Sequence, residues 1–206
     1  NGYGWIKGQR ARAVPDLEQY HKTHTFLSDA LTLEASKEIE KAVAEKKTFY
    51  LNMAHYAVHS PFETDERFIS HYTDPNKSQQ ARAFATLIEG MDKSLGDILD
   101  KLEDMGIAEN TLIIFLGDNG GDAPLGDAAD YGSSAPFKGK KGSEYEGGVR
   151  VPFIVSWAHP NPNNKFQKVY PIARNAIQTQ MGTVMDIYPT VLSVAGVKPA
   201  PNHILD

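Results

Sequence analysis

The feature that most restricts the fold is a helical pattern that leads into a continuous apolar run. Apolar residues recur every three or four positions over 80–105, which predicts a long helix with one buried face. Gly106 follows at the position of a left-handed C-cap. The next segment, Thr111–Gly117 (TLIIFLG), predicts a strand covered on both faces, as at the centre of mostly parallel sheets. A helix that precedes such a strand favours the α/β folds.

Weaker patterns on both sides extend this alternation of helix and strand. Near-helical spacing of apolar residues predicts a helix that begins after Thr32, as its N-cap, and ends near Lys46. The other expected elements are strands at 48–54 and 149–157, a helix at 183–195 that ends before Gly196, and a surface excursion at 158–180. The expected fold is an α/β sandwich with a mostly parallel central sheet flanked by helices.

Composition excludes several classes of protein. A formal net charge of -5 and a pI near 5.8 exclude the broad basic surface of a nucleic-acid-binding protein. No apolar stretch approaches the roughly 20 residues of a membrane span. The absence of cysteine excludes disulfides, zinc–thiolate clusters and a thiol nucleophile within these residues. We therefore expect a soluble protein with a small-molecule or glycan substrate and no nucleic-acid partner.

Polar residues follow two of the predicted strands at the end where open α/β sheets bind ligands. His55 and His59 follow the first strand, and Asp118 and Asn119 follow the second one in the sequence FLGDNGG. A carboxylate and an amide supply the hard oxygen ligands that calcium and magnesium prefer. Asp-Asn-Gly is also an ordinary turn sequence. The position at the end of a buried strand favours a metal site.

Acidic residues farther along the chain do not extend this site. Asp122, Asp127 and Asp130 do not have the spacing of an EF-hand loop, and no glutamate closes the pattern. We expect them to be solvated loop acids.

A basic loop comes next. Lys138, Lys140 and Lys141 would suit a tetrahedral anion if one ammonium lay close to the metal, and a solvated loop is the alternative. The glycines of GSEYEGGVRVP do not form a Walker A motif. Glu146 with the two glycines after it is expected to have a structural role, with Arg150 as an anchor.

Four of these segments, in this order, resemble the sulfatase family of the alkaline-phosphatase-like superfamily. They are HYAVHSPF, IEGMDKSLGDILDKLEDMG, TLIIFLGDNGG and KGKKGSEYEGGVRVPFIVSW, and MDIYPTVLSVAG follows them. The resemblance spans about residues 29–199. It implies that Asp118 and Asn119 bind a metal ion, Ca²⁺ in preference to Mg²⁺, and that His59 and Lys141 contact the sulfate.

Other residues depart from the family pattern. His55 has no counterpart in it and is expected to be a residue at the end of a strand. The family nucleophile is a formylglycine made from the first residue of a Cys/Ser-x-Pro-x-Arg motif, upstream of the matched segments together with two acidic metal ligands and a Lys/His pair. Ser134 begins a similar sequence, but Lys138 stands in place of the arginine and the segment follows the Asp-Asn pair, so we interpret it as a coincidence.

The resemblance therefore implies that residues 1–206 are the C-terminal-side part of a sulfatase catalytic domain. Residues 1–28 are expected to be an irregular connection and 29–199 the core segments, with the N-terminal half and the C-terminal subdomain outside the chain. The chain starts at Asn1 rather than at a methionine, which also suggests an upstream segment. A periplasmic or secreted location is expected from the resemblance alone.

The implied activity is hydrolysis of an aryl or carbohydrate sulfate ester. A hydrated formylglycine from the upstream part would attack sulfur, while the metal, Lys141 and His59 stabilise the negative charge. The chain alone is expected to be inactive. Two alternatives stay open: a phosphomonoester or phosphonate hydrolase of the same superfamily, and a noncatalytic module that binds calcium or a sulfated glycan.

Overall fold

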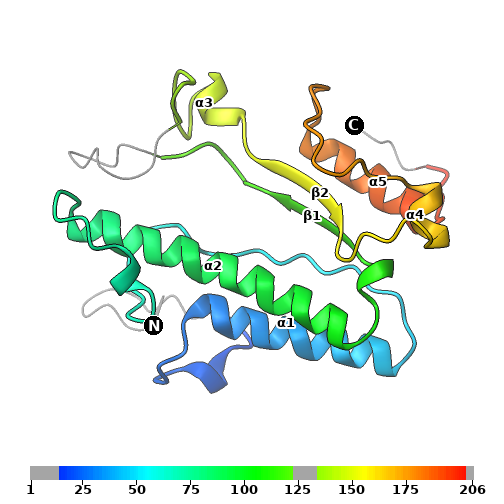
Figure 1. Cartoon of the computed structure of the whole chain (residues 1–206), viewed down its shortest axis with the longest axis horizontal. Helices are drawn as coiled ribbons and strands as arrows, with labels where there is room; N and C mark the ends of the chain where they lie inside the picture. The colour runs from blue at the N-terminus through cyan, green and yellow to red at the C-terminus, as the bar shows by residue number, and fades with distance from the viewer. Residues whose placement is uncertain (1–13, 123–133, 203–206) are drawn as a thin grey trace.

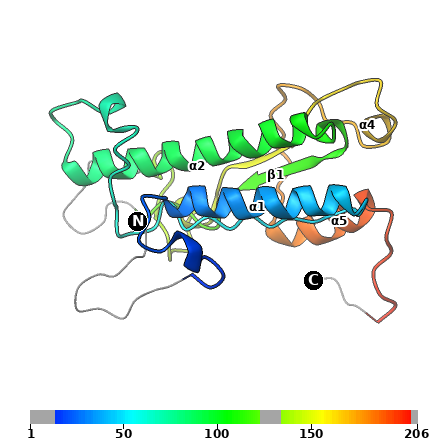
Figure 2. The same ribbon diagram turned by 90° about the horizontal axis from the view of Figure 1, so that it is seen from below.

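The computed structural model describes residues 14–122 and 134–202. Two long helices, α1 (Leu27–Ala44) and α2 (Gln79–Asp104), lie side by side and form one layer (Figures 1 and 2). A short ribbon of β1 (Leu112–Leu116) and β2 (Phe153–Trp157) lies beside α2. Beyond the ribbon is α5 (Ile187–Val194). None of the helices in the described residues is long and apolar enough to cross a membrane.

The main core lies where the C-terminal halves of α1 and α2 meet the start of β1. Its buried members come from these two helices and from the turn before β1: Ala35, Ile39, Ile98, Leu102 and Ala108. The predicted helix at 80–105 is confirmed as α2 to within one residue at each end. The predicted cap is also confirmed, because Gly106 has φ +67° and the Ile107 N–H donates to the Leu102 carbonyl at 3.0 Å.

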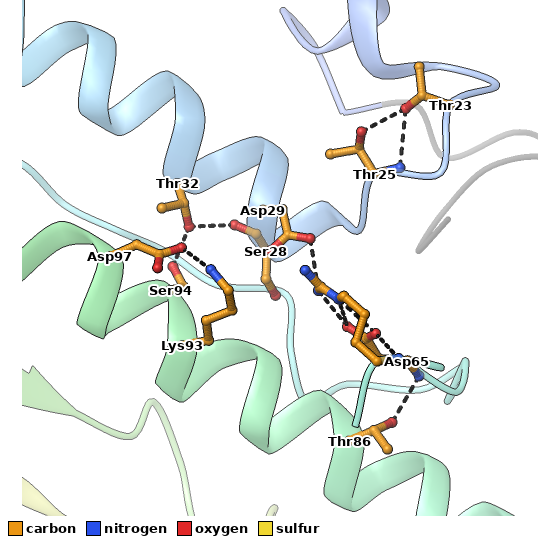
Figure 3. Close-up of polar contacts among 11 residues, drawn as sticks. Thr23, Thr25, Ser28, Asp29, Thr32, Asp65, Thr86, Lys93, Ser94 and Asp97 are labelled. Carbon is orange, nitrogen blue, oxygen red and sulfur yellow. Dashed lines mark hydrogen bonds and ion pairs between the residues drawn. The ribbon is translucent and has the colours of Figure 1, made fainter. Parts of the chain in front are cut away.

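The start of the first predicted helix is wrong. The helix begins at Leu27 after Phe26, so Thr32 lies inside α1 and is not its N-cap. Thr32 is buried, its hydroxyl donates to the Ser28 carbonyl, and it also contacts the Ser94 hydroxyl of α2 (Figure 3). Thr32, which the sequence pattern predicts to be a helix N-cap, therefore makes a hydroxyl contact between the two helices. Residues 1–13 of the expected irregular connection lie outside the described residues.

The strands differ from the prediction in number and direction. β1 and β2 are antiparallel, with Ile114 opposite Val155, and they form the only sheet within 14–122 and 134–202. β2 is shorter than the expected strand at 149–157 because α3 (Glu146–Val149) includes its first residue. The strand predicted at 48–54 is wrong for this structure, since the segment pairs with no described strand.

The predicted surface excursion is anchored to the fold. It contains a short helix, α4 (Lys165–Val169). Gln167 in this helix is buried, and its amide donates to the carbonyls of Glu109 and His159, both at 2.8 Å. The helix predicted at 183–195 is confirmed as a 3₁₀ turn (Val184–Asp186) that continues into α5.

Asp65 fixes the loop between residues 60 and 71 to both long helices. Its side chain is buried and accepts hydrogen bonds from the Arg67 guanidinium, including one of 2.9 Å from Nε. Arg67 also pairs with Asp29 of α1 at 2.8 Å, and the Asp65 N–H donates to the Thr86 hydroxyl of α2 at 3.0 Å (Figure 3). Hydrogen bonding to Asp65 raises the pKa of Arg67 above its usual range. We call these four residues the Asp65 cluster.

Glycines bring the turn after β1 against the turn before β2. The Gly120 N–H donates to the Gly148 carbonyl at 2.9 Å, and the Gly147 N–H donates to the Lys138 carbonyl at 2.8 Å. A Cβ at Gly120 would lie 1.9 Å from the Gly147 carbonyl oxygen, so a larger residue cannot be accommodated without moving the backbone. The two turns therefore form one packed unit at the end of the ribbon.

Replacing Asp65 with alanine should lower the free energy of unfolding by about 2–3 kcal/mol, because a buried carboxylate that accepts several charged hydrogen bonds is lost. Urea denaturation measures the change. Glu66→Ala is the matched control, since Glu66 is exposed, and it should have little effect. Equal urea midpoints for the two variants would contradict the stabilising role of the Asp65 cluster.

Replacing Gly120 with alanine should lower the thermal midpoint, with a loss of about 1–3 kcal/mol, because the new methyl group overlaps the Gly147 carbonyl. Gly96→Ala is the control. Gly96 lies inside α2 with nothing within 4 Å of a Cβ, so this change should stabilise the helix by up to about 1 kcal/mol. Thermal unfolding of both variants should show shifts of opposite sign, and shifts of the same sign would refute the prediction.

Candidate active site

One cleft of about 2090 Å³ brings the predicted site residues together. Its walls are the segment 46–60, β1 and parts of α2 and α5. The residues predicted for the site from sequence all line it: His59, Asp118, Asn119 and Lys141. They come from three separate parts of the chain, and a main-chain hydrogen bond places Lys141 beside the Asp-Asn turn.

Asp118 and Asn119 directly follow β1 and Gly117. The Asn119 N–H donates to Asp118 Oδ1 at 2.9 Å, and the Asn119 side-chain amide donates to the Gly120 carbonyl at 3.0 Å. Within the described residues, Asp118 Oδ2 and Asn119 Oδ1 accept no hydrogen bond. Carboxylate and amide oxygens are the type of hard donor that divalent cations prefer.

Two side-chain oxygens are too few to hold a metal ion by themselves. Calcium takes roughly 6–8 oxygen ligands. Over 14–122 and 134–202, no group of three or more His, Cys, Asp or Glu side chains is close enough to hold a metal ion. The donor chemistry of Asp118 and Asn119 fits calcium, and the number of donors requires further ligands.

Lys141 is fixed beside this pair by the main chain. Its N–H donates to the Gly121 carbonyl at 2.9 Å, two residues after Asn119. The side chain is half-buried, and its ammonium makes no ion pair or hydrogen bond with any residue that the structure describes. A half-buried ammonium at a cleft, without an internal partner, is suited to binding an anion.

The other lysines of the basic loop are engaged elsewhere. Lys140 Nζ lies 3.5 Å from Asp122 Oδ1, and Lys138 Nζ lies 4.0 Å from the centre of the Tyr145 ring. Of the three acids expected in loops, Asp127 and Asp130 lie outside the described residues.

Glu146 and Arg150, which were expected to be structural, and Ser134, which was interpreted as a coincidental match, all make contacts around this loop. Arg150 pairs with Glu146 at 3.1 Å and lies over the ring of Phe137. The Ser134 hydroxyl donates to the Gly147 carbonyl at 2.9 Å. Each of these side chains is therefore engaged in holding the loop together.

The two histidines of the site have different surroundings. His59 is exposed, and its Nδ1 lies 2.9 Å from the Ser60 carbonyl, which requires the proton on Nδ1. His55 was expected at the end of a strand, but no described strand precedes it in the structure. It is half-buried against α2, with Nε2 at 3.4 Å from the Ser94 hydroxyl and a buried Nδ1 that has no partner within the described chain. Burial lowers the pKa of His55, so its ring is neutral near pH 7.

Sequence reasoning missed the contact between His55 and α2. The Ser94 hydroxyl also contacts Thr32, so three polar residues from distant parts of the chain form one row that is buried at Thr32 and Ser94 and half-buried at His55. No local sequence pattern predicts these contacts, because the three residues lie far apart in the sequence and none stands out within its own segment.

Comparison with known proteins extends the match over nearly the whole chain. The sulfatase family model matches residues 2–197. N-acetylgalactosamine-6-sulfatase of Mus musculus is 32% identical over 180 residues, which are 87% of this chain and 31% of that protein. Steryl-sulfatase of Homo sapiens is 29% identical over 93% of this chain and 30% of its own length. The chain thus spans about a third of the length of these relatives.

Solved structures show the same relationship. The crystal structure of Ps i-CgsB in complex with k-i-k-neocarrahexaose matches with a TM-score of 0.75 and 29% identity, over 90% of this chain and 37% of that one. The PsFucS1 sulfatase from Pseudoalteromonas sp. matches with a TM-score of 0.62 and 28% identity, over 83% of this chain and 30% of its own. These matches confirm the expected alkaline-phosphatase-like α/β fold, present here in part, and the chain belongs to the sulfatase family.

Proposed function

We propose that the complete protein hydrolyses a sulfate monoester of an aryl or carbohydrate compound. In this proposal the chain supplies one part of the active site through Asp118, Asn119, His59 and Lys141. The observation that carries the proposal is the cleft that these residues share. Membership of the sulfatase family supports the type of reaction. Residues outside this chain supply the rest of the site, because the chain spans only about a third of its relatives.

Lys141 is proposed to bind the sulfate group. Its ammonium lines the cleft without an internal ion pair, so it can donate hydrogen bonds to the sulfuryl oxygens. These oxygens gain negative charge as the ester bond breaks, and a fixed cation stabilises that charge without reorganisation. The backbone bond to Gly121 keeps the lysine at a constant position relative to the Asp-Asn turn.

His59 is proposed to contact the same anion and to assist the leaving group. Its Nδ1 proton is held by the Ser60 carbonyl, so Nε2 is the nitrogen left for the substrate. In the doubly protonated ring, Nε2 donates to a sulfate oxygen. The same proton can pass to the alcohol oxygen when the bond from that oxygen to sulfur breaks.

Asp118 and Asn119 are proposed to hold a calcium ion through Asp118 Oδ2 and Asn119 Oδ1. When bound, the ion supplies positive charge at the sulfuryl oxygens. The nucleophile, a formylglycine, is proposed to come from the part of the protein outside this chain. The isolated chain then lacks both the nucleophile and most of the metal ligands, and it should be inactive.

In the complete protein, alanine at Lys141 or at His59 should lower kcat/KM for an aryl sulfate such as 4-nitrophenyl sulfate by about 100- to 1,000-fold, because one charge-stabilising contact is lost. Lys140→Ala is the matched control. Lys140 has its partner in Asp122, so its removal should have a much smaller effect. Assays with 4-nitrophenyl phosphate test the alternative reaction. Faster hydrolysis of the phosphate than of the sulfate would count against a sulfatase.

The isolated 206-residue chain should bind Ca²⁺ much more weakly than the complete protein, because it presents two of the roughly 6–8 ligands that calcium takes. Isothermal titration calorimetry with CaCl₂ measures both affinities. Asp118→Ala in the complete protein should reduce its affinity, and Asp122→Ala should not. Equal, tight binding by the isolated chain would disprove the idea that the site is divided.

A further inference from the structure

His55 joins the segment that carries His59 to α2, and the proposed reaction does not use it. Its Nε2 lies 3.4 Å from the Ser94 hydroxyl of α2. Its Nδ1 is buried and has no hydrogen-bond partner within residues 14–122 and 134–202. The ring is therefore held at one nitrogen, and the other nitrogen is left without a partner in the described chain.

The hydroxyl groups next to His55 fix which of its nitrogens carries the proton. The Thr32 hydroxyl donates its hydrogen to the Ser28 carbonyl at 2.7 Å, so it accepts in its contact with Ser94 (Figure 3). Ser94 has one hydroxyl hydrogen and donates it to Thr32, so its oxygen accepts from His55 Nε2. The neutral His55 ring therefore carries its proton on Nε2, and its Nδ1 carries a lone pair.

A second proton on His55 is unfavourable in this position. It would add to Nδ1 and create a positive ring with a buried N–H that has no acceptor among the described residues. Burial lowers the pKa of His55 from its ordinary value of 6.5. Because this pKa is lower in the packed segment than in a released one, packing is favoured above pH 6.5 and weakens as the pH falls below it.

Charged groups on the surrounding elements do not offset this cost. On α2 Lys93 pairs with Asp97, and on α1 Asp29 pairs with Arg67. The charged residues of the cleft wall and its other histidine are Lys46, Lys47, His59, Asp118, Asp122 and Lys141. Burial is the cause of the shift in the pKa of His55, and no charge of a described residue contributes to it.

The segment that carries His59 contacts α2 on both sides of this residue. On one side is the contact of His55 with Ser94, and on the other the rings of Phe62 and Phe84 pack at 5.3 Å between centroids. A tight turn links His55 to His59, because the His59 N–H donates at 2.9 Å to the carbonyl of residue 56, directly after His55. Of the two anchors, His55 is the one that can change its charge.

We propose that His55 is a positioning residue of the active site. As a neutral ring it holds the segment 55–59 on α2, and when it gains a second proton the ring leaves Ser94 and His59 moves with it. The inference rests on the proposed function, which assigns His59 to the active site. Acid then changes the arrangement of the site through a residue that does not touch the substrate.

NMR titration of the complete protein, labelled with ¹³C at histidine Cε1, tests the proposal without substrate. The variants His55→Gln and His59→Gln assign the two resonances. The His55 resonance should titrate below pH 6.5. The His59 resonance should show, besides its own titration, a second step at the pKa of His55.

Two further spectra separate movement of His59 from the effect of a nearby charge. In His55→Gln the second step of His59 should be absent, because glutamine keeps an N–H donor for Ser94 and cannot gain a proton. In Ser94→Ala the anchor is already lost, so the second step should also be absent. His71→Gln is the matched control, since exposed His71 bonds to Glu89 elsewhere, and it should leave the second step in place.

The pH dependence of kcat/KM for 4-nitrophenyl sulfate measures the effect on the reaction. His55→Leu should lower kcat/KM at pH 7.5 by about 10- to 100-fold, because the anchor is lost and His59 is misplaced. His55→Gln should retain most of the activity at pH 7.5. At pH 5 this variant should keep a share of its pH 7.5 activity that is at least about fivefold larger than the share kept by the unsubstituted protein.

Four results would overturn the proposal. The first is a His55 resonance that titrates at pH 6.5 or above, which would mean that a group outside this chain accepts from Nδ1. The second is a His59 resonance that shows its own titration alone. The third is a second step that persists in Ser94→Ala, which would come from charge without movement. The fourth is an equal acid loss of activity in His55→Gln and in the unsubstituted protein.

The two kinds of measurement keep this inference separate from the proposed function. A complete protein that hydrolyses no sulfate ester would count against the proposed function. The NMR titration would still decide whether His55 positions His59, because no substrate is present in it.

Discussion

The arrangement of the candidate site depends on how closely backbone segments approach one another at the end of the β1–β2 ribbon. The turn after Asn119 and the turn before β2 are held by direct main-chain hydrogen bonds, and Gly120 leaves room for a carbonyl where any side chain would stand. This contact places a carboxylate, an amide and an ammonium beside the same cleft without any bond between their side chains. A site built in this way draws its geometry from the backbone, and the side chains remain free to bind the ligand.

Polar contacts join the two helices of the layer in addition to the apolar core between them. Thr32 contacts Ser94 between α1 and α2, and the Asp65 cluster joins the loop after residue 60 to both helices. Few large apolar residues are fully buried, and Ile39 and Leu102 are the largest of them. Buried polar contacts depend on direction, so they fix how the helices are placed relative to each other. The segment with His55 and His59 leads into the Asp65 loop and is held at that end.

The sequence predicted the elements that are determined locally. The helix at 80–105, its glycine cap and the apolar strand before Asp118 are confirmed, because apolar periodicity and capping act within a few residues. The strand at 48–54 and the parallel sheet were not found, because strands form only with a partner and the described residues provide none. The candidate residues of the site were proposed from their type and order, and they stay a prediction. Their gathering into one cleft, and the contact between His55 and Ser94, depend on long-range packing that a local pattern does not record.

The backbone bond from Lys141 to Gly121 has a consequence for how such a site can change through evolution. The lysine and the Asp-Asn pair are separated by about twenty residues of sequence, yet their relative position is set by one main-chain contact that does not depend on the side chains between them. Apart from Gly120, Ser134 and Phe137, which hold the two turns together, that sequence can vary in composition while the lysine and the Asp-Asn pair keep their spacing. In loops of this kind, substitutions next to the site can change which substrate binds without moving the residues of the site.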